Sequence, residues 1–347
     1  MKKKILLINK SLSVGGIETV LLTQYRTLKM SGHDVDILLF KDIVDFPVQN
    51  IQDIYYLDNY SSIKSFVNMR EKTSSYQLII CHAQSERICK KVKSLHRKNI
   101  LFVMHGMHSK KLLNGNIFAR FLRKARMQFL YKDQNLVTVS DAVKDDIESI
   151  KINYKKIETI YNPFDIEHIK NLACQKLDIK IKKQYLVWVG RISEVKNLPF
   201  LLEVYIHLAS SYDLVMIGDG SENIKSELLQ TIKQHGIEDK VHFLGFLENP
   251  YPYIKNAKSL LLTSDNEGLP TVVLESLILN TPVFSRNIPA VNEILSNYYT
   301  KGICHSDNKK EIAEQILQNI NKPINVHKIH KELSFKNSNN KYLNYFQ

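Results

Sequence analysis

The chain has 347 residues, of which 44% are hydrophobic, and 48 Lys and Arg against 35 Asp and Glu give it a formal net charge of +13. At ~150 residues per domain this length suggests about two domains, and the composition excludes a disordered or collagen-like chain. The apolar runs are far shorter than the ~20 residues of a membrane-spanning helix. The run that follows the N-terminal lysines is also shorter than the ~7 to 15 residues of a secretory signal, so we expect a cytoplasmic protein.

Short β-rich runs alternate with amphipathic stretches, such as Glu18–Met30, along the first half of the chain. This alternation predicts βαβ units and a parallel sheet covered on both faces. The predicted strands are Lys4–Asn9, Val35–Phe40, Ile54–Leu57, Leu78–His82, Ile100–His105, Leu136–Ser140 and Ile157–Tyr161.

A second series of the same kind follows a charged stretch that ends at Lys183. Two consecutive series predict an α/β protein with two doubly wound domains, at residues 1–165 and 184–325. Residues 166–183 are expected to be a linker and residues 326–347 a tail, solvated at 336–341 and with a possible last turn at 342–346. The predicted strands of the second series are Tyr185–Val189, Leu214–Ile217, Val241–Leu244, Ser259–Thr263, Pro282–Ser285 and Gly302–His305.

Ligands of open α/β sheets bind beyond the carboxyl ends of the strands, so we expect the site in a cleft between the two domains. In the first domain, Gly15 and Gly16 follow the first strand at the start of a helix, where free N–H groups and the helix dipole favour an anion. A tight turn explains this glycine pair equally well. His105 ends the fifth strand, and structural and functional roles for it are evenly balanced.

In the second domain, Val189-Gly190-Arg191 ends the first strand and Lys196 follows in the same loop. Two fixed cations beyond a strand end suit a diphosphate, although a solvated loop would look the same.

The strongest local signal is the segment from Ser264 to Glu275, in which Glu267 and Gly268 form a turn and Pro270 suits the first position of a helix. The backbone N–H groups of residues 268–271 offer a second anion site. Glu267 and Glu275 lie on either side of it and can accept hydrogen bonds from hydroxyl groups. This combination describes a ligand with sugars on both sides of a diphosphate, which is a nucleotide sugar.

Five motifs in this order resemble the large family of retaining glycosyltransferases with the GT-B fold, family 4. The resemblance extends from the first loop to about Glu293, and it implies two Rossmann-like domains that face each other across a cleft. The motifs are Gly15-Gly16, the V-T-V-S run that ends at Ser140, V-G-R-x-x-x-x-K-N from Val189 to Asn197, G-D-G-S-E from Gly218 to Glu222, and E-G-L-P-x-x-x-L-E from Glu267 to Glu275.

The resemblance also implies roles for individual residues. Arg191 and Lys196 would hold the donor diphosphate, and Gly190 would lie close to it. The backbone of four further residues would also contact the phosphates: Gly268, Leu269, Pro270 and Thr271. Glu267 would bind hydroxyls of the donor sugar and Glu275 the ribose. Phe246 would lie beside the base, Gly15 and Gly16 near the phosphates, and His105 near the sugar and the acceptor. The last helix of such folds often crosses back to the first domain.

The implied reaction moves a hexosyl or N-acetylhexosaminyl group with retention from a nucleotide sugar, a UDP-sugar being favoured, to a glycan or lipid-linked acceptor. The setting would be the synthesis of lipopolysaccharide, O-antigen or capsule, with no cofactor and no obligatory metal. The chain departs from the family pattern at Asn280-Thr281-Pro282-Val283 and at Ile288–Glu293, where many members have G-x-P-V and Gly-Gly-Pro-Glu. An inactive scaffold of the same shape, or a binding partner of another glycosyltransferase, is the alternative.

Charge is concentrated in residues 87–132, which contain 13 Lys and Arg and no Asp or Glu. A nucleic acid partner is not expected, because no aromatic stacking motif accompanies these cations. Within this segment, a helical pattern at 117–130 has an apolar face, which we interpret as core packing, and a basic remainder. Because basic residues bind anionic leaflets, we expect residues 87–132 to hold the protein peripherally at the inner face of the cytoplasmic membrane. The apolar face consists of Phe118, Phe121, Leu122, Ala125 and Phe129.

Overall fold

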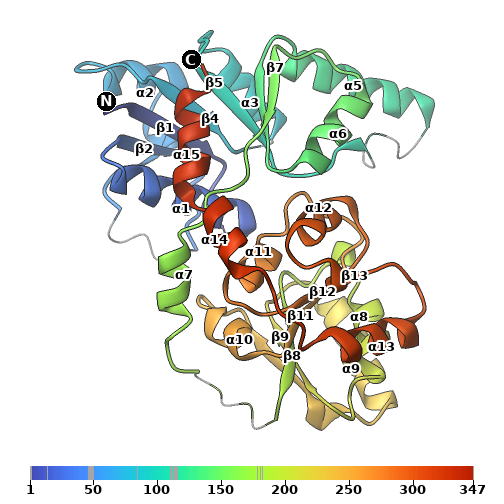
Figure 1. Cartoon of the computed structure of the whole chain (residues 1–347). Helices are drawn as coiled ribbons and strands as arrows, with labels where there is room; N and C mark the ends of the chain where they lie inside the picture. The colour runs from blue at the N-terminus through green and yellow to red at the C-terminus, as the bar shows by residue number, and fades with distance from the viewer. Residues whose placement is uncertain are drawn as a thin grey trace. The chain divides into compact units, whose positions relative to one another are not determined.

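A computed structural model describes residues 2–13, 15–45, 51–83, 85–109, 112, 116–177, 179, 181 and 183–346. The chain divides into two compact units (Figure 1). The N-terminal unit comprises Met1–Asp165 and Leu333–Gln347, and the C-terminal unit comprises Ile166–Glu332. Among the helices that the structure describes, none combines the length and the hydropathy needed to cross a bilayer.

The described part of the N-terminal unit contains a seven-stranded parallel sheet in the order β3-β2-β1-β4-β5-β6-β7. Its central strands are buried on both faces, as their unbroken apolar runs predict. The strands are β1 (Lys4–Asn9), β2 (Asp34–Leu39), β3 (Ile54–Tyr56), β4 (Leu78–Cys81), β5 (Ile100–Met104), β6 (Asn135–Thr138) and β7 (Lys156–Thr159).

Right-handed crossovers place α1 on one face of this sheet and the helices that follow β3, β4, β5 and β6 on the other. In the described residues before the domain boundary, the helices with given bounds are α1 (Gly16–Met30), η1 (Leu57–Asn59), α2 (Ile63–Arg70), α3 (Glu86–Lys93), α5 (Ile117–Tyr131) and α6 (Asp141–Ile150).

Helix α15 (Phe335–Asn344), near the end of the chain, belongs to the N-terminal unit and runs beside α1 (Figure 1). The stretch 336–341, expected to be solvated, is helical, and its residues Ser338 and Asn339 are buried while the other four are exposed. Asn339 is buried and donates to the hydroxyl of Thr27 at 3.0 Å, and the Tyr345 hydroxyl donates to the carbonyl of Leu136 at 3.1 Å. The Asn- and Lys-rich composition concealed a helix that is anchored to the rest of this unit through the side-chain amide of Asn339.

The described part of the C-terminal unit repeats the architecture with six parallel strands in the order β10-β9-β8-β11-β12-β13. These two parallel sheets confirm the predicted fold class. The strands are β8 (Tyr185–Val189), β9 (Asp213–Ile217), β10 (Val241–Gly245), β11 (Ser259–Leu262), β12 (Val283–Arg286) and β13 (Ile303–Cys304).

The helices of this unit form two mutually contacting groups, which the crossovers assign to opposite faces of the sheet. One group is α8 (Leu198–Ile206), α9 (Glu222–Gln234) and α13 (Lys309–Asn319). The other is α7 (Ile166–Leu172), α10 (Tyr251–Asn256), α11 (Thr271–Ile278), α12 (Pro289–Tyr298) and α14 (Val326–Glu332). The short helices η2 (Glu194–Lys196), η3 (Glu238–Lys240) and η4 (Thr300–Gly302) lie in loops. The expected linker therefore begins with a helix, α7, that packs against α10 and α11.

Helix α5 is the clearest difference between expectation and structure. Its predicted core face is exposed: Phe118, Phe121 and Phe129 retain 69%, 68% and 62% of their accessible surface. The buried residues of α5 are Met127, Leu130 and Tyr131. At 100° per residue these three lie on the side of the helix opposite Phe118, so α5 packs on the unit through a different face.

Candidate functional site

The candidate donor-binding residues lie on loops beyond the carboxyl ends of β8 and β11, the two central neighbours of the C-terminal sheet. The chain leaves β8 toward β9 on one side and later returns to β11 on the other. This reversal is a topological switch point, where loops diverge and leave room for a ligand. The loop after β8 carries Gly190, Arg191 and Lys196, and the loop after β11 carries Glu267.

Lys196 and Glu267, 71 positions apart, form an ion pair at this switch point. The ammonium Nζ of Lys196 donates to Oε1 of Glu267 at 2.6 Å, and the two side chains are 20% and 14% exposed. The two charged groups therefore orient each other, and both side chains remain partly accessible to solvent. A diphosphate that approaches Lys196 and a sugar hydroxyl that approaches Glu267 would both enter an already ordered pair.

The two loops are also joined through their backbones. The hydroxyl of Thr263 donates to the carbonyls of Lys196 and Asn197 at 3.0 and 3.1 Å. The N–H of Asp265 donates to the carbonyl of Val195 at 2.9 Å. Asn197 adopts a left-handed conformation, with φ of 47°, which Asn tolerates better than most residues. The position of Lys196 relative to Glu267 is therefore fixed by several hydrogen bonds as well as by the ion pair.

The G-D-G run after β9 packs tightly against the loop after β8. A Cβ at Gly218 would lie 1.8 Å from the carbonyl oxygen of Gly190, and one at Gly220 would lie 2.2 Å from that of Ile192. The N–H of Ile192 donates to the carbonyl of Asp219 at 2.9 Å. Glycine is required at 218 and 220 because only a residue without a side chain permits this approach. The run therefore supports the loop that carries Arg191.

Glu275 lies in the second turn of α11 and is buried. Burial raises the pKa of its carboxyl to about 7, and a hydrogen bond from the Tyr251 hydroxyl, at 3.4 Å from Oε1, opposes this rise. A buried carboxyl with one long hydrogen bond is poorly satisfied. It is suited to accept hydrogen bonds from hydroxyl groups of a ligand.

The other predicted donor residues lie at the same edge of this sheet. Residues 268–271 lead into the first turn of α11, and Pro270 is its N-cap without a side-chain hydrogen bond. Phe246 follows β10 and is 49% exposed, and Arg191 is exposed in the loop after β8. Their roles toward a donor stay predictions.

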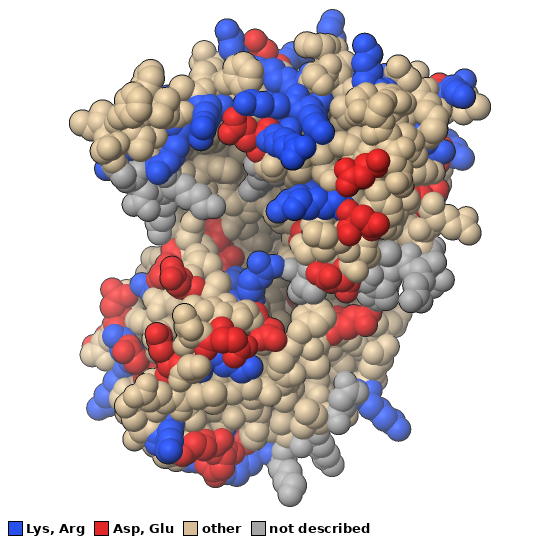
Figure 2. All heavy atoms as spheres, turned by 180° about the vertical axis from the view of Figure 1, so that it is seen from behind, with Lys and Arg blue, Asp and Glu red and all other residues tan. Residues whose placement is uncertain are grey.

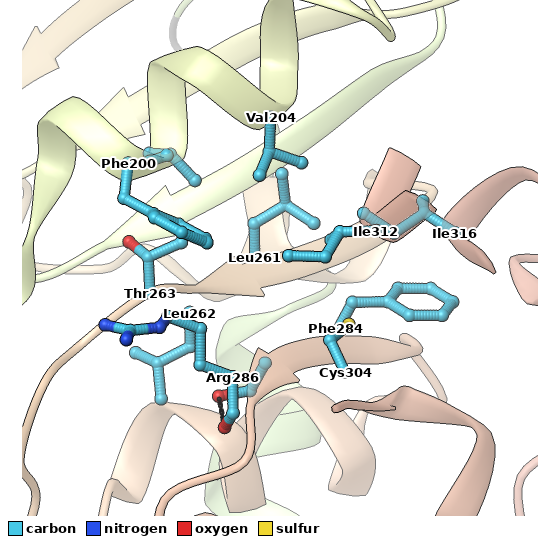
Figure 3. Close-up of a pocket in the computed structure, with 12 residues that line it drawn as sticks. Phe200, Val204, Leu261, Leu262, Thr263, Phe284, Arg286, Cys304, Ile312 and Ile316 are labelled. Atoms are coloured by element: carbon cyan, nitrogen blue, oxygen red, sulfur yellow. Dashed lines mark hydrogen bonds between the residues drawn. The ribbon is translucent and has the colours of Figure 1, made fainter. Parts of the chain in front are cut away.

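A cavity of about 20 Å³ lies close to these loops but inside the unit, between α8, α13 and the strands β11 and β12 (Figure 3). Phe200, Leu261, Phe284 and Ile312 are among its lining residues. Such a volume holds about one water molecule and cannot take a nucleotide. The guanidinium of Arg286 lies 4.8 Å from the ring centre of Phe200 and pairs with Asp265, so it serves the structure of the β11 loop.

One departure from the family pattern has a simple structural reason. Asn280 lies just after α11 with φ of 61°, a conformation that favours glycine and that Asn also adopts. Asn280 therefore adopts, at the position of the family glycine, a conformation for which glycine is the usual residue.

In the N-terminal unit, the glycine pair and His105 also follow strand ends. Gly15 is the N-cap of α1 in an extended conformation, and a Cβ on Gly16 would meet no atom within 4 Å. The backbone there does not require glycine, and the space beside Gly16 is open. His105 follows β5, and its Nε2 lies 3.0 Å from Nδ1 of His82, which follows the neighbouring strand β4. His82 was not singled out from the sequence, although it ends a predicted strand just as His105 does.

Solved structures of similar shape show the same fold at low sequence identity. A crystal structure of Anabaena HepE in complex with UDP and glucose superposes with a TM-score of 0.79 and 16% identity, covering 99% of both chains. The pneumococcal O-GlcNAc transferase GtfA in complex with UDP and GlcNAc gives a TM-score of 0.70 and 12% identity over 99% of this chain and 98% of that one.

Curated relatives match over most of their length. The chain is 27% identical to an N-acetylgalactosamine-N,N'-diacetylbacillosaminyl-diphospho-undecaprenol 4-alpha-N-acetylgalactosaminyltransferase of Campylobacter jejuni, over 79% of this chain and 78% of that protein. It is 26% identical to the lipopolysaccharide 1,6-galactosyltransferase of Salmonella typhimurium, over 81% of this chain and 79% of that protein.

Two family models together match nearly the whole chain. The model described as Glycosyltransferase Family 4 matches residues 14–168, and the model described as Glycosyl transferases group 1 matches residues 170–334. The chain is therefore a glycosyltransferase with the GT-B fold and belongs to family 4.

Proposed function

We propose that this glycosyltransferase moves a hexosyl or N-acetylhexosaminyl group, with retention, from a UDP-sugar to a lipid-linked glycan of a cell-envelope polysaccharide. The observation that carries the proposal is the Lys196–Glu267 pair at the switch point of the C-terminal sheet. Relatives that act on undecaprenol-linked and lipopolysaccharide acceptors support the acceptor class. Structural neighbours crystallised with UDP support the donor class.

In the proposed reaction the bond between the anomeric carbon and the donor phosphate oxygen breaks, and the acceptor oxygen forms its bond on the same face of the sugar. The acceptor proton goes to the departing phosphate oxygen, so no side chain acts as nucleophile. Lys196 and Arg191 stabilise the negative charge that develops on the diphosphate, as preorganised cations do in other sites. Glu267 orients the sugar through its hydroxyls and Glu275 the ribose. Two side-chain cations and the α11 N-terminus supply the charge stabilisation for which other enzymes use a metal ion.

Purified protein is to be incubated with UDP-glucose, UDP-galactose, UDP-GlcNAc, UDP-GalNAc and GDP-mannose, with and without EDTA. We expect slow hydrolysis of at least one UDP-sugar, release of the α-anomer in early ¹H NMR spectra, and a rate that EDTA does not change. Release of the β-anomer would contradict retention, and strict dependence on a divalent ion would contradict the role given to Arg191 and Lys196. UDP binding without any turnover would favour the inactive scaffold.

The N-terminal unit carries the whole net charge of the protein. It has 29 Lys and Arg against 16 Asp and Glu, whereas the C-terminal unit has 19 of each. Figure 2 shows Lys and Arg side chains grouped together on the N-terminal unit. The ammonium groups of Lys90 and Lys93, on α3, lie 5.5 and 5.4 Å from the ring centre of the exposed Phe129 on α5. Exposed aromatic rings and cations therefore occupy one surface.

We propose that this surface docks on an anionic phospholipid membrane, where a lipid-linked acceptor is found. Phe118 and Phe121 project from the side of α5 that faces away from the unit, so they can enter the interfacial region of a leaflet. Neighbouring lysines contribute ~1 kcal/mol each near an anionic surface. Lys110 and Lys111, which belong to the same basic segment, lie outside the described residues.

Sedimentation with phosphatidylcholine vesicles, with and without phosphatidylglycerol, tests this docking at low and high salt. The wild type is expected to bind the phosphatidylglycerol vesicles most strongly at low salt, because salt screens the lysines. The double variant Phe118→Ser/Phe121→Ser should bind at least ~10-fold more weakly, given ~1.5 to 3 kcal/mol for each buried Phe. Met30→Ser, at a residue 68% exposed on α1, is the matched control and should bind like the wild type. Failure of the wild type to bind at both salt concentrations would favour a soluble acceptor.

A further inference from the structure

A row of three hydrogen-bonding side chains runs through the interior of the N-terminal unit and ends at His105. Gln24, on α1, is fully buried, and its Oε1 lies 2.8 Å from Nε2 of His82. His82 is 1% exposed, and its Nδ1 lies 3.0 Å from Nε2 of His105. The two imidazole rings are 5.2 Å apart and tilted by 30°. Three elements, α1, β4 and β5, thus converge on one ring at a strand end.

Because both imidazoles are neutral, each hydrogen bond in this row has one defined donor and one defined acceptor. Burial keeps the pKa of His82 well below its usual range and lowers that of His105 to about 4. A neutral imidazole has one donor and one acceptor nitrogen. The structure turns the amide oxygen of Gln24 toward His82, and with the amide in this orientation Nε2 of His82 donates and its Nδ1 accepts. His105 must therefore donate through Nε2–H, which leaves its Nδ1 as an acceptor.

We infer that Gln24 and His82 are positioning residues that hold His105 in the Nε2–H tautomer and present its Nδ1 as an acceptor for a sugar hydroxyl. The inference rests on the proposed function for its ligand class. A hydroxyl of the donor sugar or of the acceptor glycan can donate to this nitrogen. Because His105 is already in the tautomer that accepts the hydroxyl, no free energy is spent on shifting it from the other tautomer when substrate binds. His82 and Gln24 then act on the reaction through His105 without touching substrate.

The tautomer can be read directly in the full-length protein by long-range ¹H–¹⁵N NMR with ¹⁵N-labelled histidine. His105→Asn and His82→Asn assign the two sets of signals. The wild type is expected to show His105 as a single Nε2–H tautomer. In His82→Phe, which removes the acceptor, His105 should become a mixture of tautomers, and in Gln24→Met the tautomer of His82 should no longer be fixed. A wild-type His105 in the Nδ1–H form, or one unchanged in His82→Phe, would overturn the inference.

Turnover of the best UDP-sugar gives an independent reading. His82→Phe should lower kcat/KM about tenfold, the worth of one hydrogen bond of ~1.4 kcal/mol. His82→Asn keeps an acceptor oxygen close to the position of Nδ1 and should restore most of this loss, which a merely structural role would not predict. His235→Asn, at an exposed histidine of the other unit, is the control and should change nothing. Equal losses in His82→Phe and His82→Asn would overturn the inference. If no UDP-sugar is turned over, the proposed function fails, while the NMR result still decides the tautomer.

Discussion

Replacing Lys196 by Ala is expected to lower turnover of the UDP-sugar by ~10² to 10³-fold, which is the usual cost of removing one donor from a preorganised anion site. The loss has two causes. The leaving diphosphate loses a cation, and Glu267, which Lys196 contacts at 2.6 Å, keeps its negative charge close to the incoming phosphates. Glu267→Ala should lose a similar factor because the sugar hydroxyls lose their acceptor. Steady-state rates and thermal midpoints of both variants provide the measurement.

The double variant Lys196→Ala/Glu267→Ala shows how much of the loss in rate depends on the ion pair and how much on each residue alone. If the pair acts as a unit, the double variant should lose much less than the product of the two single losses. Lys170→Ala is a matched control, because Lys170 pairs with Glu167 at 3.2 Å through solvent-exposed side chains on α7 of the same unit. It should retain the wild-type rate. A single variant at 196 or 267 with more than about half the wild-type rate would contradict the role assigned to that residue, given the size of the effect.

The fold could be predicted from the sequence because parallel strands buried on both faces leave a pattern that is hard to mistake. The run Tyr185–Val189 matches β8 at both ends, and Lys4–Asn9 matches β1. In each case a continuous apolar run is bounded by polar or glycine residues. The rule that ligands bind beyond strand ends then selected Lys196, Glu267 and His105 without any contact information. Their positions in the sequence did not give the distances between their side chains in space, and only the structure shows that Lys196 pairs with Glu267.

The errors arose where a helix has more than one plausible buried face. The pattern of α5 was interpreted from its phenylalanines, whereas the helix packs through Met127, Leu130 and Tyr131. Both faces have helical spacing, so periodicity alone could not choose between them. The first part of helix α15, at 336–341, was interpreted as solvated for a different reason. Its buried face includes Ser338 and Asn339, whose burial depends on a hydrogen bond to Thr27 in a distant part of the chain.

Glu275→Gln is expected to stabilise the ligand-free protein at pH 8 and to weaken its binding of UDP. Burial raises the pKa of the folded-state carboxyl to about 7, from 4.5 in an exposed chain. The folded state therefore binds a proton more tightly than the unfolded state between these values. The stability that this group contributes is present below pH 4.5, falls as the pH rises to 7, and is then constant. The shift corresponds to about 3 kcal/mol at pH 8.

A glutamine at 275 stays neutral at every pH, so it avoids the free-energy cost of burying an ionised carboxylate above pH 7. Urea unfolding should give the variant a free energy of unfolding up to about 3 kcal/mol above that of the wild type at pH 8, and a smaller difference at pH 5. Glu227→Gln, at an exposed position on α9, should unfold like the wild type at both pH values. Equal stability of Glu275→Gln and wild type at pH 8 would show that the carboxylate is not destabilised by its surroundings.

Calorimetry with UDP tests what the buried carboxylate is for. Ribose hydroxyls that donate to Glu275 favour its charged form, so UDP binding should release a proton near pH 7 and the measured enthalpy should depend on the ionisation enthalpy of the buffer. Glu275→Gln should abolish this dependence and raise the Kd of UDP at least about tenfold, since a hydrogen bond to a charged group contributes ~1.5 to 3 kcal/mol. If the variant gains stability but binds UDP like the wild type, burial does destabilise the Glu275 carboxylate, but this carboxylate does not bind the ribose. A loss of UDP affinity together with a gain in stability would mean that the protein gives up free energy of folding at Glu275 in order to hold the nucleotide.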